Sequence, residues 1–263
     1  MKGPRASGVY VERFGSGPDL VMLHGWAMHG GLLRDLAERL SACYRVSLID
    51  LPGHGGSGPI DDYSLASVTD KLLEVAPSSA HWLGWSLGAL LAIGVESAHP
   101  GRVRSLAMIA GSPRFTAGIG WPGVDLCLLE QMASNLEQDF SGTLKRFIAL
   151  QVFSQDNARE LTKRIQEIID ERPVPDAGAL RGGLALLRGA DFRPVLAAFQ
   201  KPVLAILGAQ DRLVPKAVAP ELLQLNADME VHELFSAAHL PFLTHPEETA
   251  SLIREFMFRQ DQG

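Results

Sequence analysis

The stretch from Ala80 to Val95 constrains the fold more than any other part of the chain. An apolar run, 80–83, enters the segment Gly84-Trp85-Ser86-Leu87-Gly88, and a second apolar run, 87–95, leaves it. This order predicts a strand, a sharp turn and a helix, with Ser86 at the corner. The two glycines have a steric reason, because only residues without a Cβ let the strand and the helix approach so closely. The turn lifts the Ser86 hydroxyl to the start of the helix, where free N–H groups stabilise negative charge.

The composition favours one compact α/β domain with an insertion. The chain has 263 residues, of which 46% are hydrophobic, so it can bury a large core. A formal net charge of −6 argues against a nucleic-acid or anionic-membrane partner for the body of the protein. Cys43 and Cys127 lie far apart in no metal-ligand spacing, so we expect neither a disulfide framework nor a bound metal. Residues 1–8 contain no apolar export segment and no apolar run approaches a membrane span, so we expect a cytoplasmic protein.

Strands and helices alternate over residues 1–111, which predicts a mostly parallel, doubly wound sheet. The expected strands are 9–14, 20–23, 45–49, 80–83 and 102–110, and the expected helices are 32–40, 64–75 and 87–95. The alternation resumes over residues 195–263, with strands at 202–207 and 230–234 and helices at 217–225 and 246–258.

The pattern changes between these two parts, over residues 112–194. No buried strand is predicted there, and four amphipathic stretches predict helices at 124–136, 143–153, 158–169 and 179–187. We interpret residues 112–194 as a helical cap inserted into the α/β core.

The residues after two later strands can complete a catalytic group with Ser86. A serine hydroxyl needs a base within hydrogen-bond reach, and the base needs an orienting acid, in the chain order Ser, Asp, His. Asp211 and His239 each follow a predicted parallel strand, so they should lie at the same sheet edge as Ser86. The competing His81 would lie at the opposite edge, and Asp50 is expected to organise its own Pro-Gly loop. We therefore predict the catalytic triad Ser86, Asp211 and His239.

Two backbone N–H groups are expected to form an oxyanion hole. One belongs to Leu87, the residue after the nucleophile, and the other to the loop after the strand 20–23. Within that loop the residue after Gly25 is the natural donor, which is Trp26. We expect the Trp26 backbone to donate and its ring to line the pocket.

Five segments together resemble the α/β hydrolases over nearly the whole chain. They are His24-Gly25-Trp26, Asp50-Leu51-Pro52-Gly53-His54-Gly55-Gly56-Ser57, Gly84 to Gly88, Gly208 to Pro215 and Ala237 to Pro246. The Gly-Trp-Ser-Leu-Gly segment, the tryptophan of His-Gly-Trp and the cap segment 146–151 resemble more specifically the BioH-type carboxylesterases of biotin synthesis.

This resemblance implies a serine esterase that hydrolyses the methyl ester of a pimeloyl-acyl-carrier-protein and releases methanol, with no cofactor. It implies that the acyl channel is lined by cap residues, namely Phe147, Ile148, Ala149, Leu150 and Gln151, together with Trp26, Ser86, Leu87 and His239. The basic cap residues Arg146, Arg159 and Lys163 would meet the acidic carrier protein, and we expect a monomer. Two positions depart from the family pattern, because Ala27 and Ala89 stand where glycine is frequent.

Plainer interpretations of the cap remain open from the residues alone. The apolar face of the helix 143–153 can pack on the core without lining a channel. On the next helix, Glu160 could pair with Arg164 in an ordinary salt-bridged surface.

Other activities on the same scaffold also remain open. A haloalkane dehalogenase or epoxide hydrolase is disfavoured because those enzymes need a carboxylate at the position of Ser86. A carbon–carbon bond hydrolase, a haloperoxidase-like enzyme and a non-catalytic binding protein are the alternatives, because fold and triad do not fix the substrate.

Overall fold

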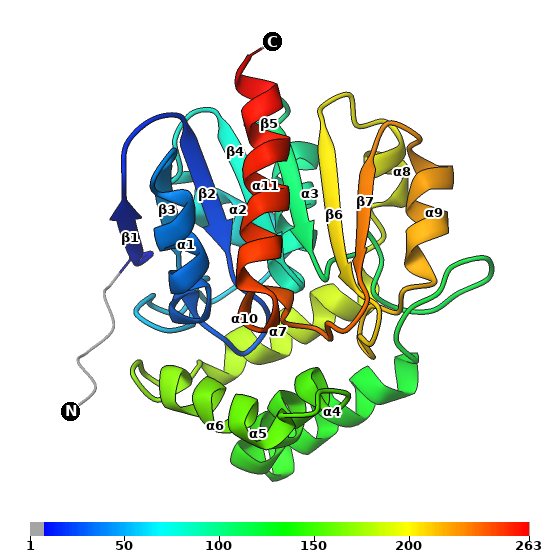
Figure 1. The fold of residues 1–263 in the computed structure, drawn as a ribbon. Helices are drawn as coiled ribbons and strands as arrows, with labels where there is room; N and C mark the ends of the chain where they lie inside the picture. Colours follow the sequence, from blue (N-terminus) through cyan, green and yellow to red (C-terminus); the bar gives the residue numbers. More distant parts are fainter. Residues whose placement is uncertain (1–7, 263) are drawn as a thin grey trace.

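A seven-stranded sheet crosses the centre of the molecule in the computed structural model, which describes residues 8–262 (Figure 1). The strand order is β1-β3-β2-β4-β5-β6-β7, in which β1 pairs antiparallel with β3 and every other neighbouring pair is parallel. The mostly parallel, doubly wound α/β sheet predicted from the sequence is confirmed. Residues 1–7, where no export segment is expected, lie outside the described residues.

The strands are short and, in the middle of the sheet, apolar on both faces, because helices cover both sides of a parallel sheet. Their bounds are β1 Val11–Phe14, β2 Asp19–Leu23, β3 Arg45–Ile49, β4 Ala80–Trp85, β5 Val103–Ile109, β6 Val203–Gly208 and β7 Glu230–Leu234.

Helices α1 and α11 pack together on one face of the sheet, and α2 and α3 pack together on the other (Figure 1). The core helices are η1 Gly30–Leu33, α1 Arg34–Leu40, α2 Leu65–Leu73, α3 Leu87–Ala98, α8 Arg193–Ala197, α9 Val218–Leu225, α10 Pro241–Thr244 and α11 Pro246–Asp261. No helix within the described residues has the length and apolar character required to cross a membrane.

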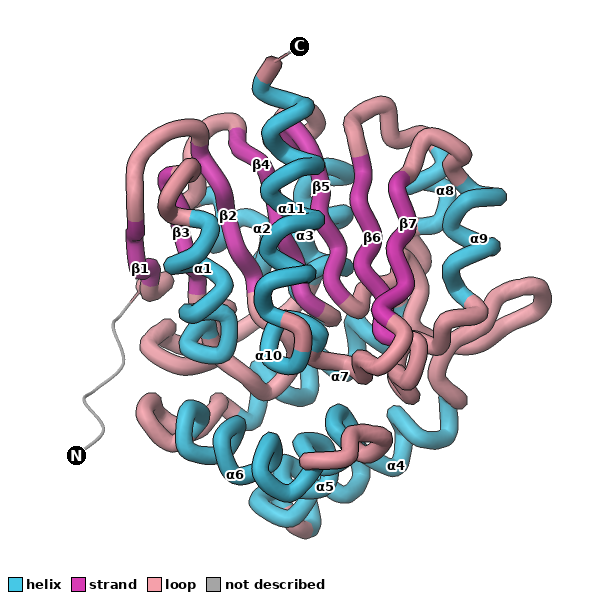
Figure 2. Tube along the Cα trace, in the orientation of Figure 1, coloured by secondary structure: helices cyan, strands magenta, loops and turns pink. Residues whose placement is uncertain are grey.

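Five helices lie between β5 and β6 in the chain, and the first four of them gather beyond the carboxyl ends of the strands (Figure 2). They are α4 Leu126–Gln138, α5 Phe140–Val152, α6 Ala158–Ile169 and α7 Ala177–Gly189. Their position matches the helical segment expected over 112–194, whose boundaries as a cap remain our proposal. The loops after β2, β4, β6 and β7 end at the same edge and meet these helices there.

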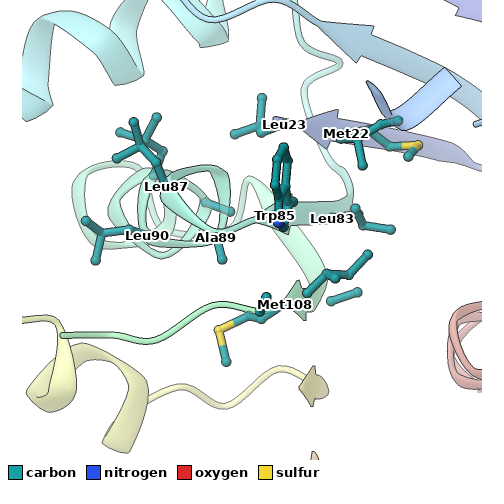
Figure 3. Packing of buried hydrophobic residues seen from close by; sticks show 14 of the residues in the cluster. Met22, Leu23, Leu83, Trp85, Leu87, Ala89, Leu90 and Met108 are labelled. Atoms are coloured by element: carbon teal, nitrogen blue, oxygen red, sulfur yellow. The ribbon is translucent and has the colours of Figure 1, made fainter. Parts of the chain in front are cut away.

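Buried hydrophobic side chains enclose the β4–α3 turn. Side chains from β2, β4, β5 and α3 surround it, and Trp85 stands among them (Figure 3). Leu23, Leu83 and Leu87 are fully buried there. A turn enclosed in this way is held rigidly, which suits a residue that has to keep one position.

Three local expectations differ from the structure. The helix expected over 32–40 is divided into the 3-10 turn η1 and the helix α1, and the short helices α8 and α10 are not predicted at all. The pairing of Glu160 with Arg164 is wrong, because Arg164 instead binds Asp35 of α1 at 2.8 Å. That partner is distant in the chain, so helical spacing cannot reveal it.

Candidate active site

Ser86 occupies a strained turn between β4 and α3. Its backbone has φ +55° and ψ −118°, a conformation that costs energy for any residue with a side chain. The turn is fixed in part by the Ser86 N–H, which donates to the Ile109 carbonyl of β5 at 3.0 Å. The hydroxyl is thereby held at the start of α3, as the sequence predicts.

The glycines on either side of Ser86 are required by close backbone contacts. A Cβ on Gly84 would lie 2.3 Å from the Ala89 nitrogen, and one on Gly88 would lie 2.4 Å from the Leu23 oxygen. Real Cβ atoms do not approach backbone atoms so closely, so this turn accepts no larger residue at either position.

The structure brings Ser86, His239 and Asp211 into one hydrogen-bonded chain. His239 Nε2 lies 2.9 Å from Ser86 Oγ, and His239 Nδ1 lies 2.7 Å from Asp211 Oδ2. The other carboxylate oxygen of Asp211 accepts the N–H groups of Leu213 at 2.7 Å and Val214 at 3.1 Å. Because that oxygen is occupied by backbone donors, the carboxylate is oriented to accept the imidazole N–H with Oδ2.

The two loops that carry Asp211 and His239 are joined at their backbones. Gln210 N–H donates to the Ala237 carbonyl at 2.9 Å. Gly208 makes this approach possible, because a Cβ there would lie 2.1 Å from the Ala238 oxygen. The acid and the base therefore keep a fixed spacing although 28 residues separate them in the chain.

The backbone of the loop after β2 passes beside Ser86. A Cβ on Gly25 would lie 3.2 Å from the Ser86 Cβ, so the residue that precedes Trp26 lies against the nucleophile. Within residues 8–262, neither the Trp26 N–H nor the Leu87 N–H donates to another protein group. Their assignment as the two donors of an oxyanion hole stays a prediction.

The side chain of Trp26 fastens this loop to the cap. Its indole nitrogen donates to the Leu180 carbonyl of α7 at 2.9 Å, and its ring packs edge-on against Phe147 of α5. These contacts hold the ring between α5 and α7, and its role as a wall of the substrate pocket stays a prediction.

His24, which begins this loop, is held as a neutral donor and acceptor. Its Nε2 accepts the Leu51 N–H at 2.9 Å, so the proton lies on Nδ1, which donates to the Gly25 carbonyl at 2.8 Å. Burial lowers the pKa of His24 to about 3, with a smaller contribution from the neighbouring His54. The ring stays neutral at neutral pH and keeps both hydrogen bonds.

The predicted channel residues divide between two sides of α5. Phe147, Ile148 and Gln151 are buried and face the core, whereas Ala149 is exposed and Leu150 is half-buried. The Gln151 backbone carbonyl accepts the His239 N–H at 3.3 Å, and its buried amide oxygen makes no hydrogen bond within the described residues. That oxygen is a free acceptor beside the triad.

The three triad residues are buried. Ser86 is 4% exposed, Asp211 6% and His239 1%. An apolar cavity of about 210 Å³ lies nearby between α5, α6 and the loop after β2, and Ala27, Met28 and Ile148 belong to its wall. A polar cleft of about 300 Å³ lies between the α5–α6 turn and the loops that carry Asp211 and His239.

The three basic residues predicted to meet a carrier protein are all exposed on α5 and α6. Arg146 lies 3.2 Å from Asp139, and Lys163 lies 3.7 Å from Glu167. Arg159 forms no ion pair with any described residue. These pairs are solvent-exposed, so they hold the cations only weakly.

The competing residues lie where the sequence places them. His81 contacts Ser105 and Asp261, away from the triad. Asp50 organises its own loop by accepting the Gly56 N–H at 2.7 Å. It also binds Arg172 of the α6–α7 connection, a contact that sequence reasoning missed because no local pattern indicates it.

Comparison with known proteins agrees with this geometry. The family model described as "Alpha/beta hydrolase family" matches residues 20–252. The chain belongs to the alpha/beta hydrolase family. Among solved structures, the esterase from Exiguobacterium antarcticum has the same fold and superposes with a TM-score of 0.85 at 22% identity, covering 94% of both chains.

Within the alpha/beta hydrolases, curated relatives with one name share much of this sequence. The pimeloyl-[acyl-carrier protein] methyl ester esterase of Methylococcus capsulatus is 43% identical over 95% of this chain and 98% of the relative. The protein of the same name from Edwardsiella ictaluri is 42% identical over 95% of this chain and 97% of the relative. The expected resemblance to this group of alpha/beta hydrolases is confirmed.

Proposed function

We propose that this chain is a serine carboxylesterase that hydrolyses the methyl ester of pimeloyl-acyl-carrier-protein, freeing the ω-carboxylate and methanol in biotin synthesis. The observation that carries the proposal is the hydrogen-bonded chain from Asp211 through His239 to Ser86. The shared name of relatives about 40% identical over nearly the whole chain supports the choice of substrate.

In the proposed reaction, His239 Nε2 takes the proton of Ser86 as Oγ attacks the ester carbonyl. The Trp26 and Leu87 N–H groups stabilise the negative oxygen of the tetrahedral intermediate. His239 then gives the proton to the departing methoxide, which leaves as methanol. A water molecule, deprotonated by the same imidazole, cleaves the acyl-enzyme and releases the acid.

The two cavities support a substrate with an apolar and a polar part. The apolar cavity beside Ile148 and Ala27 offers hydrocarbon-lined space of the kind that an acyl chain requires. The polar cleft carries hydrogen-bonding side chains, among them Gln155, Asn157 and Gln210, which suit the amide groups of a carrier's phosphopantetheine arm.

Arg146, Arg159 and Lys163 are proposed to attract the acidic carrier protein. Exposed, weakly paired cations act mainly on the rate of encounter, which falls with added salt. The triple variant Arg146→Glu, Arg159→Glu and Lys163→Glu should slow turnover of the carrier-linked ester at low salt and leave a small ester unaffected. Equal turnover of the carrier-linked ester would remove this part of the proposal.

The reaction is assigned to the cytoplasm, where biotin-pathway carriers would meet the enzyme. Cys43 and Cys127 are both exposed and unpaired, which suits a reducing compartment.

The deciding experiment is methanol release from purified pimeloyl-carrier methyl ester. Ser86→Ala should lower turnover by about 10⁴-fold or more, because the nucleophile is lost. Ser105→Ala, which removes a buried serine far from the triad, is the matched control and should keep full activity. Slow carrier-ester turnover beside rapid p-nitrophenyl acetate hydrolysis would reject the substrate and keep the esterase. A single slow turnover of both would indicate a binding protein.

A further inference from the structure

A buried ion pair joins the cap to the core at the α6–α7 connection. Arg172 Nη1 lies 2.7 Å from Asp50 Oδ1 and 2.6 Å from Asp50 Oδ2. The Arg172 side chain is 12% exposed and that of Asp50 is fully buried. Because desolvating two charges costs free energy, a buried pair of this kind is weak evidence for stability alone. Arg172 and Asp50 are therefore candidates for a second role.

The same carboxylate holds the far end of the loop that carries Trp26. Asp50 Oδ1 accepts the Gly30 N–H at 2.7 Å, and Oδ2 accepts the Gly56 N–H at 2.7 Å. Gly30 lies four residues beyond Trp26 on that loop. Asp50 therefore connects a cap residue with the segment that presents one of the two proposed oxyanion donors.

The loop is fixed at its other end by His24, which bonds both Leu51 and the Gly25 carbonyl. Between the two ends, His29 Nε2 lies 3.1 Å from the Ile168 carbonyl of α6. The Trp26 indole also holds the loop, through the Leu180 carbonyl, so the direction of the Trp26 N–H depends in part on how firmly Asp50 holds Gly30.

The guanidinium of Arg172 is held in place by further contacts. Its second nitrogen bonds Glu12, and its guanidinium lies over the Tyr10 ring at 5.0 Å. If Arg172 were lost, Asp50 would remain as a buried carboxylate with no cation beside it. Such a group takes up a proton or draws in water, and either change weakens its hold on the Gly30 N–H.

We propose that Arg172 is a positioning residue that makes the oxyanion hole depend on the seating of the cap, acting through Asp50 and the loop from His24 to Gly31. The inference rests on the proposed function, because it assumes that the Trp26 N–H stabilises a reacting oxygen. With the cap seated, Arg172 neutralises Asp50 and the loop is fixed. With the connection displaced, the donor loses its direction while the triad stays assembled.

The test uses Arg172→Gln in the full chain with p-nitrophenyl acetate, a small ester that does not need the carrier. Loss of one oxyanion donor lowers turnover by about 10²–10³-fold, and displacement of the donor should cost part of that. We expect kcat to fall about 10- to 100-fold with KM within twofold. A trifluoromethyl ketone, whose adduct with Ser86 carries the oxyanion, should bind more weakly by a similar factor.

Arg164→Gln is the matched control. Arg164 also joins the cap to the core, through Asp35 at 2.8 Å, but this exposed pair does not touch the loop that carries Trp26. Its removal should leave both kcat and inhibitor binding within twofold. An equal loss in both variants would mean general loosening of the cap and would overturn the proposal.

Arg172→Lys is a second, more conservative variant, which tests the proposal even if Arg172→Gln does not fold. It keeps a cation beside Asp50 but loses the planar two-pronged contact, so an intermediate loss of kcat and of inhibitor affinity is expected. Unchanged kcat and inhibitor affinity in a folded Arg172 variant would overturn the inference about Arg172. The esterase proposal would still stand in that case, provided that Ser86→Ala is inactive. An active Ser86→Ala would instead reject the esterase proposal itself.

Discussion

The indole nitrogen of Trp85 donates a hydrogen bond of 2.9 Å to the backbone carbonyl of His239. Trp85 directly precedes Ser86, and its ring also packs edge-on against Phe242 with centroids 5.1 Å apart. One buried side chain thus sets the spacing between the turn that presents the hydroxyl and the loop that presents the imidazole.

Trp85→Phe should keep most of the packing and remove this hydrogen bond. We expect kcat for p-nitrophenyl acetate to fall about tenfold through misplacement of His239, and the free energy of unfolding to fall by about 1 kcal/mol. Trp82→Phe is the control, because Trp82 donates to the Arg102 carbonyl at 3.2 Å at the other end of β4. It should lose similar stability without losing kcat, and an equal loss of kcat would contradict the argument.

Gly84→Ala should prevent the β4–α3 turn from closing. The added Cβ would meet backbone atoms of Gly88 and Ala89 at 2.3 Å, so the free energy of unfolding should fall by about 3 kcal/mol or more. Gly189→Ala, where the new Cβ meets nothing within 4 Å apart from its chain neighbours and the backbone of its own helix, should be neutral or slightly stabilising. Urea unfolding of both variants measures the difference, and similar midpoints would show that the turn can relax.

Ala27→Gly should stabilise the fold or leave it unchanged. Ala27 has φ +63°, a conformation that costs a residue with a side chain about 1–2 kcal/mol. Glycine avoids this cost but loses more backbone entropy on folding, which offsets about 0.5–1 kcal/mol of the gain. The expected gain in unfolding free energy is at most about 1 kcal/mol, with activity within twofold. Ala89→Gly within α3 should instead lose about 1 kcal/mol. Opposite signs at these two positions are the outcome to look for in urea unfolding, and a loss at both would refute the strain argument.

Acid should destabilise the protein through His24. Burial lowers its pKa from 6.5 to about 3, so between these values the unfolded chain binds a proton that the folded chain refuses. The contribution of His24 to the free energy of unfolding is therefore fully present well above pH 6.5. It declines as the pH falls, by about 2 kcal/mol between pH 7 and pH 5. Burial also lowers the pKa of His29 and of His81, which adds loss of the same sign.

His24→Asn isolates the first contribution. Asparagine can still donate to the Gly25 carbonyl but does not titrate, so the variant should lose less stability between pH 7 and pH 5 than the parent. Denaturant unfolding at the two pH values measures this, and identical pH dependence would show that His24 is not the cause.

Much of this architecture follows from local sequence patterns. The bounds of β3, β7 and α6 agree with the predicted ranges, because apolar alternation and helical spacing are properties of neighbouring residues. Ser86, Asp211 and His239 each come soon after a parallel strand, which is sufficient to place them at one sheet edge, because the carboxyl ends of parallel strands all lie there.

The remaining features depend on contacts between distant segments. Helices α8 and α10 have five and four residues, too few for a periodic pattern to appear. The pairing of Arg164 with Asp35 joins residues 129 apart in the chain. The Asp50–Arg172 pair likewise forms only after the cap has folded onto the core, so neither residue is marked by its neighbours.

Helix α11 ends beyond the edge of the sheet that lies opposite the cap (Figure 1). A surface or resin attached at this end would hold the molecule with α5 and α6 directed toward the solution. Immobilisation there leaves room for a large macromolecular substrate to approach, whereas attachment through lysines of the cap would block it. The orientation of the catalyst on a support can thus be chosen from the fold alone.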